Sequence, residues 1–178
     1  MKRRPVRALS PTALEVAPMP TVGHPSALSP QLPTIELTLP EGWIAEPGGD
    51  ALFRATHGRG GDLAPQLTAY IHTSREATTD DLVDDLVIEA EAHDEGEADP
   101  TFAVDLDGRT WTGLNVSWID DGEPVYVVHL VTAIAAGDVT QLARLTGRIA
   151  GPHSERDYDE VQDVLETVRL TPALGDDA

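Results

Sequence analysis

The sequence contains no cysteine and few aromatic residues. Because none of the 178 residues carries a thiol, disulfides, cysteine-based zinc sites, cysteine nucleophiles and a lipidated cysteine are excluded. Aromatic residues make up only 4% of the chain, so valine, leucine, isoleucine and alanine must fill the interior. A chain of this length is enough for one domain, and we expect that domain to have an aliphatic core.

Long hydrophobic runs are lacking as well. Charged residues and prolines interrupt the stretch that follows the basic start MKRRPVRAL, so we expect no secretory signal. No apolar run approaches the ~18 residues that a membrane helix requires. Together with the lack of cysteine, these features predict a cytoplasmic protein that does not insert into a membrane.

Basic residues are scarce relative to acidic ones. The 12 lysines and arginines stand against 31 aspartates and glutamates, which gives a net charge of −19. Residues 1–33 hold four of the basic residues and one acidic residue, a charge of +3 that leaves −22 for the remainder. A domain this acidic repels phosphate backbones, so nucleic-acid binding is not expected. Mutual repulsion also predicts a monomer or a weak oligomer.

The two ends of the chain differ in composition from the middle. Residues 1–33 contain seven prolines and no sustained periodicity, which is typical of a disordered arm. The folded domain is expected over residues 34–172, and residues 173–178 are expected to form a flexible acidic tail.

Hydrophobic periodicity predicts seven strands and two helices in the folded part. Short turn-forming links such as DG at 107–108 join the last four strands, which favours an antiparallel meander. Amphipathic helices need a sheet to pack on, so we predict an α+β fold with an antiparallel sheet flanked by two helices. The expected strands are 34–40, 51–57, 65–73, 101–106, 109–119, 124–135 and 139–150, and the expected helices run from Thr78 or Thr79 to Ala90 and from Ser154 to Val168.

Both predicted helices begin with residues that favour a helix start. Thr78 or Thr79 can cap the first helix, and the two aspartates that follow suit its positive end. Ser154 and Asp157 have the spacing of a capping-box pair at the start of the second helix.

The order of these elements, together with several short motifs, resembles a known family. The motifs are LPEGW at 39–43, TDDLVDDL at 79–86, GRTWTG at 108–113, LARLTGRIA at 142–150 and DEVQDVLETVRL at 159–170. In this order they are similar to the LpqN/LpqT-type proteins of actinobacteria, which belong to the wider Mog1/PsbP-like fold together with the DUF1795 chaperones of secreted effectors. The resemblance covers residues 34–172 and implies an α/β/α sandwich.

The resemblance implies a sandwich that binds other proteins or small apolar ligands, without an agreed chemistry. The leading hypothesis is a non-enzymatic adaptor or chaperone linked to a bacterial secretion or injection system, with a secreted effector or a secretion component as its partner. The alternative is a small-molecule carrier or hydrolase with a pocket between sheet and helix, anchored by His72 or His129. A third hypothesis is a structural component recruited through the basic arm at 1–33.

No constellation of residues predicts catalysis, a metal or a cofactor. Ser117 lacks the glycine-rich elbow of a nucleophilic serine, and GRGGD at 58–62 lacks the lysine of a phosphate-binding loop. Glu89 and His93 have the i, i+4 spacing of metal ligands, but we interpret them as a polar helix end. The four aspartates within 80–85 are interpreted as a solvated helix face.

The candidate binding residues come mostly from the predicted strands. Alternation in LARLTGRIA puts Arg144, Thr146 and Arg148 on one strand face, which predicts either pairing with acidic helix residues or a spot for an anion or acidic peptide. Trp111 and Trp118 are seven residues apart and therefore face opposite sides of their strand. The full set of binding-surface candidates is Trp43, His72, Trp111, Trp118, His129, Arg144 and Arg148.

Three members of this set carry further expectations. Trp43 follows Pro40 and Gly42, so it is most simply a corner packed over the end of the sheet, with an exposed site residue as the alternative. His72 and His129 each lie within a predicted strand, and they would form a pH-sensitive polar spot if both faced one surface.

Overall fold

The computed structural model describes residues 24–26, 29–58, 61, 63–151 and 153–173. Most of the predicted arm at 1–33, and all but one residue of the predicted tail at 173–178, lie outside the described residues. Within the described part, Gln141 Nε2 donates a 3.0 Å hydrogen bond to the carbonyl oxygen of Gln31. The chain therefore contacts the domain before the first strand begins.

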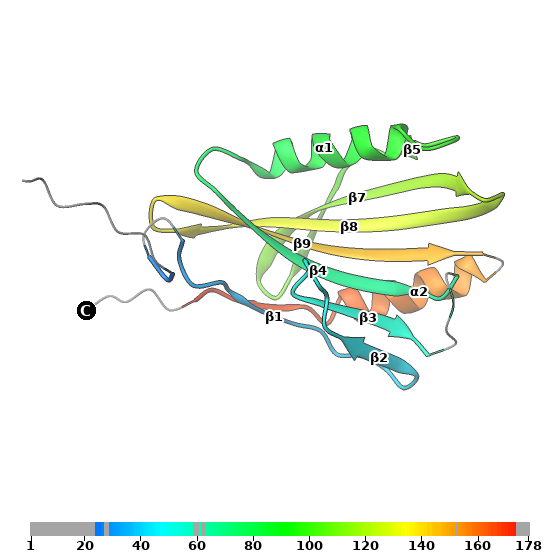
Figure 1. Cartoon of the computed structure of the whole chain (residues 1–178), viewed down its shortest axis with the longest axis horizontal. Helices are drawn as coiled ribbons and strands as arrows, with labels where there is room; N and C mark the ends of the chain where they lie inside the picture. The colour runs from blue at the N-terminus through cyan, green and yellow to red at the C-terminus, as the bar shows by residue number, and fades with distance from the viewer. Residues whose placement is uncertain (1–23, 27–28, 59–60, 62, 152, 174–178) are drawn as a thin grey trace, which may run out of the picture.

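A large antiparallel sheet forms the centre of the fold (Figure 1). Its strand order is β2-β3-β4-β9-β8-β7-β5, and β6 pairs with the part of β7 that β5 leaves free. Asp107–Gly108 and Asp121–Gly122 take positive φ angles, as tight hairpin turns require, which confirms the predicted meander. The strands are β2 (Trp43–Glu46), β3 (Phe53–His57), β4 (Gln66–Ser74), β5 (Glu97–Ala98), β6 (Phe102–Leu106), β7 (Arg109–Asp120), β8 (Glu123–Ala136) and β9 (Val139–Ala150).

A separate two-stranded ribbon brings the two ends of the domain together. In it, β1 (Thr34–Glu36) pairs antiparallel with β10 (Arg169–Thr171). The strand predicted over 34–40 is therefore shorter than expected and lies outside the main sheet. Beyond β1 the chain bonds to the end of the second helix instead, where the Thr38 amide donates to Thr167 Oγ1 at 2.8 Å.

The sequence does not predict the strands β2, β5 and β10. They contain four, two and three residues, too few for an alternating pattern to stand out. The predicted side-chain face of the first strand is nevertheless correct, because Ile35, Leu37 and Leu39 all pack against the core.

The two helices lie on opposite faces of the sheet. Leu86 of α1 (Thr79–Glu91) shares an apolar cluster with Val127 of β8, whereas Val161 of α2 (Ser154–Leu165) shares another with Val128. Successive residues of a strand point to opposite faces, so the helices sandwich the sheet between them. This arrangement confirms the predicted α+β fold with an antiparallel sheet and two flanking helices.

Both helices start where the sequence predicts, but the predicted cap is present only at α1. Thr78 caps α1 in a capping box, accepting from the Asp81 amide at 3.2 Å while its own amide donates to Asp81 Oδ2 at 2.8 Å. The predicted Ser154–Asp157 pair at α2 is wrong. Ser154 is already helical, and the Asp157 amide donates instead to the carbonyl of His153 at 3.0 Å.

One face of the sheet is only partly covered. Helix α1 packs on β5, β7 and β8, at the top of the view in Figure 1. Neither of the two described helices lies over the neighbouring half of the same face, which β9, β4, β3 and β2 form. On the other side of the sheet, α2 packs on β9, and apolar residues of β1 and β10 join the core there. The half-covered α1 face is therefore where a binding site can form.

The close contact between α2 and β9 at Gly147 leads us to predict the effect of a substitution on stability. A Cβ atom at Gly147 would overlap Cγ1 of Val161, a fully buried residue of α2. We expect Gly147→Ala to lower the free energy of unfolding by about 1–3 kcal/mol, because α2 must shift from the sheet. Chemical denaturation followed by circular dichroism measures the change.

A double mutant separates this overlap from other effects of the substitution. In a Val161→Ala background the added methyl group has room, so Gly147→Ala should cost less than about 0.5 kcal/mol there. An equal cost in both backgrounds would show that the contact with Val161 is not the cause.

Candidate functional site

The register of the strands aligns polar side chains in rows across the uncovered half of the α1 face. Thr68 of β4 lies opposite Thr146 of β9, which in turn lies opposite His129 of β8. In the next row, Tyr70 lies opposite Arg144. These residues come from segments far apart in the sequence, and the pairing of β4, β9 and β8 brings them together.

A hollow of about 200 Å³ lies where α1 meets these rows. We call it, with its strand floor, the sheet groove, and we define it by residues that line it. Leu86, Glu89 and Ala90 of α1 form its wall, and Trp118 closes it from β7. The residues that define the sheet groove are Thr68, Tyr70, His129, Arg144, Thr146 and Arg148.

Two further hollows adjoin the sheet groove. One, of about 350 Å³, shares Tyr70 and Arg144 with the groove and extends it to His72. The other, of about 490 Å³, shares Arg148 and extends it to Leu63. The three hollows therefore follow β4 and β9 along the strand direction.

The two arginines of the groove have different surroundings. The guanidinium carbon of Arg144 lies 4.4 Å from the centre of the Tyr70 ring, a cation–π contact. Arg148 forms an ion pair with Asp120 at 3.6 Å. Asp120 belongs to β7, so this ion pair joins two strands and does not involve an acidic helix residue.

His129 is a neutral polar group in the floor of the groove. It is only 8% exposed, and its Nδ1 lies 3.1 Å from Thr146 Oγ1. Burial, reinforced by the positive charge of Arg144, lowers the pKa of His129 from 6.5 to about 3. The imidazole therefore stays uncharged at neutral pH, and its low pKa makes it a weak general base.

Trp118 lies where the prediction places it, on the opposite side of β7 from Trp111. It lines the groove, and its ring stacks on His93 with centroids 4.3 Å apart and planes 10° apart. Trp111 is 0% exposed within the core on the α2 side of the sheet. Its prediction as a binding-surface residue is corrected, because no part of its side chain reaches the surface.

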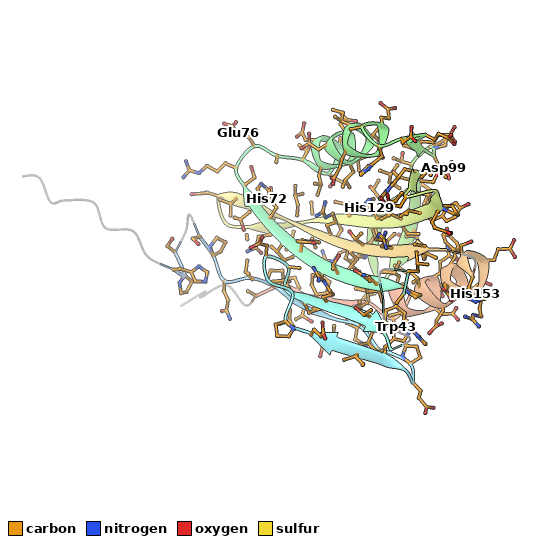
Figure 2. All side chains as sticks on the ribbon, turned by 45° about the vertical axis from the view of Figure 1, so that its right-hand side comes forward. Trp43, His72, Glu76, Asp99, His129 and His153 are labelled. Carbon is orange, nitrogen blue, oxygen red and sulfur yellow. The ribbon has the colours of Figure 1, made fainter. Side chains whose placement is uncertain are left out.

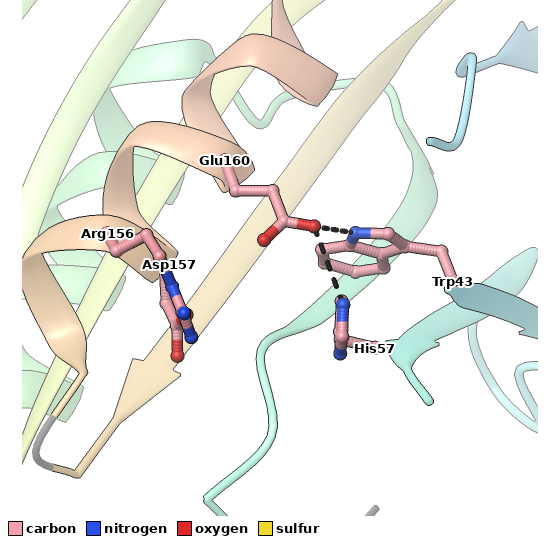
Figure 3. A network of polar contacts seen from close by, with 5 residues as sticks. All are labelled: Trp43, His57, Arg156, Asp157 and Glu160. Atoms are coloured by element: carbon pink, nitrogen blue, oxygen red, sulfur yellow. Dashed lines mark hydrogen bonds and ion pairs between the residues drawn. The ribbon is translucent and has the colours of Figure 1, made fainter. Parts of the chain in front are cut away.

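Trp43 is a packed corner. It is 9% exposed and belongs to the core cluster on the α2 side, well away from His129 (Figure 2). Its Nε1 donates to Glu160 Oε1 at 2.6 Å, and the same oxygen lies 3.8 Å from His57 Nε2 (Figure 3). The Trp43 and His57 rings meet edge to face at 6.0 Å. Trp43 therefore anchors β2 to α2, outside the sheet groove.

His72 and His129 share a sheet face but do not form one polar spot. His72 lies opposite Leu142, two residues along the strands from the row of Tyr70 and Arg144. It lines the adjoining hollow, whereas His129 lines the groove itself. The Tyr70 and Arg144 side chains separate the two imidazoles.

The sequence prediction missed Tyr70 and Thr68 as groove residues. The signal was present, because alternation in PQLTAYIHT puts Thr68 and Tyr70 on the same strand face as His72. What the sequence could not supply was the pairing of β4 with β9, which places Tyr70 beside Arg144.

The described residues contain neither a metal-ligating cluster nor a helix that could span a membrane. No group of three or more His, Asp or Glu side chains there is arranged to hold a metal ion. No helix in that part of the chain is long and apolar enough to cross a bilayer.

Two solved structures are similar to this chain. LpqN, involved in cell envelope biogenesis of Mycobacterium tuberculosis, matches with a TM-score of 0.67 and 17% identity over 85% of this chain and 89% of that chain. Cyanobacterial PsbP (CyanoP) from Synechocystis matches with a TM-score of 0.53 and 15% identity over 86% and 99%. The chain has an LpqN-like, PsbP-like fold. No protein-family model and no curated protein matches the sequence.

The LpqN-like fold confirms the resemblance drawn from the order of elements and motifs. At 17% identity the similarity shows a shared fold and does not show a shared function. Membership of the Mog1 and DUF1795 groups stays a prediction. What the LpqN-like chain binds must therefore be argued from its own groove.

The low pKa of His129 predicts a pH-dependent stability. Between pH 6.5 and about 3 the unfolded chain binds a proton at this residue that the folded chain does not. The contribution of His129 to the free energy of unfolding is therefore constant above about pH 6.5. Below that pH the free energy of unfolding falls by about 1.4 kcal/mol per pH unit, because protonation favours the unfolded chain. We expect His129→Gln to flatten the dependence of unfolding free energy on pH by this slope, measured by urea denaturation from pH 7 to 4.

The exposed His72 provides the matched control for this measurement. His72→Gln removes an imidazole from the same sheet face and should leave the wild-type slope unchanged. A His129→Gln slope equal to that of wild type would contradict the assignment.

The contact between Trp43 and Glu160 predicts a separate loss of stability. Glu160→Ala leaves the Trp43 Nε1 donor without its 2.6 Å acceptor in a partly buried site, which should cost about 1–2 kcal/mol. Asp163→Ala, an exposed position on the same helix, is the control and should cost less than about 0.5 kcal/mol. Equal losses in thermal unfolding would show that the Trp43 contact contributes nothing.

Proposed function

We propose that the protein is a non-enzymatic binding module that holds a segment of another protein in the sheet groove. The observation that carries this proposal is the helix-free half of the α1 face, where aromatic and cationic side chains border a hollow. Aromatic residues and arginine are the side chains that most often dominate protein interfaces. Tyr70, Trp118, Arg144 and Arg148 supply them here.

The finer parts of the hypothesis belong to the same proposal. An adaptor or chaperone needs a surface that accepts a partner without altering it chemically, and the groove meets that requirement. The secretion or injection link, the effector or secretion component as partner and the cytoplasmic location stay predictions, because neither the geometry nor the similar structures test them.

A small-molecule carrier is the second candidate function. Apolar side chains of Leu86, Val116, Val127 and Trp118 line the part of the groove next to α1, and a hollow between a helix and a sheet can hold a small apolar ligand. Native mass spectrometry of the purified protein would detect such a ligand. The hydrolase version has less support, because His129 is a weak base at its lowered pKa.

A substitution that fills the groove tests the leading proposal. Thr68 is half-buried in the groove floor, and the structure describes no side-chain hydrogen bond for it. We expect Thr68→Trp to leave the fold intact and to weaken partner binding at least about tenfold, since the indole occupies the space of the partner. Affinity capture from a lysate of the source organism identifies the partner, and calorimetry with the purified partner measures binding.

The control places the same side chain outside the groove. Thr171 is exposed in β10, and Thr171→Trp should bind like wild type. A partner that binds both variants equally would rule out the groove as its site. Repeated capture of no partner by the wild-type protein would count against a protein-binding function.

A further inference from the structure

Three arginines project from the uncovered half of the α1 face. Arg144 and Arg148 lie on β9, and Arg54 of β3 lies opposite Thr68 in the same row as Thr146. They are three of the eight basic residues that follow residue 33, in a region with a net charge of −22. Three arginines therefore share the half of this sheet face that α1 leaves uncovered.

Arg144 is a half-buried cation without a counter-ion. Within the described residues its guanidinium makes no hydrogen bond or ion pair, and it lies 4.4 Å from the centre of the Tyr70 ring. A partly desolvated charge with no opposite charge beside it is costly. The planar guanidinium has five donors, and it binds carboxylates through two of them at once.

The acidic groups around the groove leave this cation available. Asp120 pairs with Arg148, and Glu89 lies on the α1 wall. Asp81 and Asp85 line the adjoining hollow near His72, and Asp121 and Glu123 line the one near Leu63, so the carboxylates other than Glu89 lie toward the two ends of the groove. None of these carboxylates forms an ion pair with Arg144 in the described part of the chain. An incoming anion is therefore directed toward the strand side of the groove and away from α1.

The shape of the site favours an extended chain over a compact ion. The three hollows follow β4 from His72 to Gln66. Six residue steps of a strand span about 20 Å, which is the length of an extended segment of about six residues. A small anion would occupy only the part beside Arg144.

From these observations we infer that the sheet groove recognises an extended, carboxylate-bearing segment of a partner protein, with Arg144 as the anchor, Arg148 two rows further along β9 and Arg54 on β3 in the row between them. The inference rests on the proposed function and adds the chemical class of the ligand. Alternate side chains of an extended segment point the same way, so acidic residues at every second position meet the arginine-bearing floor.

Two synthetic peptides test the inference with the full-length protein. Both are capped nine-residue chains of alternating serine and a variable residue, which is glutamate in one and glutamine in the other. We expect the glutamate peptide to bind at least about tenfold more tightly, because each charged hydrogen bond exceeds its neutral counterpart. Shifts of backbone amide signals in nuclear magnetic resonance spectra should map to β4 and β9, and binding should weaken as salt rises.

Matched variants assign the effect to the arginines. Arg144→Gln should weaken the glutamate peptide about tenfold and leave the glutamine peptide unchanged. Arg54→Gln, at an exposed position that tolerates substitution, should weaken it to a smaller extent. Arg169→Gln removes the same charge from the exposed β10 and should have less than a twofold effect. Equal losses for Arg144→Gln and Arg169→Gln would overturn the inference.

The remaining outcomes separate this inference from the proposed function. If both peptides bind equally in the groove, the groove is a binding site but carboxylate recognition is refuted. If the shifts map outside β4 and β9, both proposals are refuted. Inorganic phosphate and glutarate serve as small-anion probes. Groove binding by either one as tight as that of the glutamate peptide would refute the extended segment as the ligand.

Discussion

The antiparallel ladder between β8 and β9 is the contact on which the rest of the structure depends. It runs without interruption from the pair Val125–Ala150 to the pair Ala136–Val139. Most residues of both strands are buried, and alternate side chains enter the two apolar clusters on opposite faces. Each helix can therefore pack on these two central strands from its own face of the sheet. The remaining strands add to the sheet on both sides of this pair.

The groove follows from the difference in width between a helix and a sheet. A helix with its side chains is about 10 Å across, whereas neighbouring strands are about 4.8 Å apart. One helix therefore covers two or three strands of a wide sheet, and α1 lies over the β7 end. The uncovered strands carry threonine, tyrosine and arginine in place of valine and leucine, as a solvated face requires. These polar and aromatic side chains also make this face suitable for binding another molecule.

The sequence was informative wherever a pattern was long enough to repeat. It predicted the four-strand meander and α1 with its Thr78 cap, and it placed Arg144 and Arg148 on one face. Short elements such as β5 carry too little pattern to be found. The start of α2 was predicted, but its capping pair was not formed, because His153 is the N-cap residue and makes no side-chain cap. The groove itself required the β4–β9 pairing, which joins segments about 75 residues apart and which no local pattern encodes.

The strands at the two ends of the sheet are short, with two residues in β5 and four in β2. An edge strand offers unpaired amide and carbonyl groups on which a foreign strand can add, and brevity limits how many bonds such an addition can form. Pro47 follows β2 directly and has no amide hydrogen to donate. The sheet is thus poorly suited to growing by one more strand, in a partner complex or in an aggregate. For the proposed protein-binding function, this favours contacts with side chains on the face of the sheet over backbone pairing along its edge.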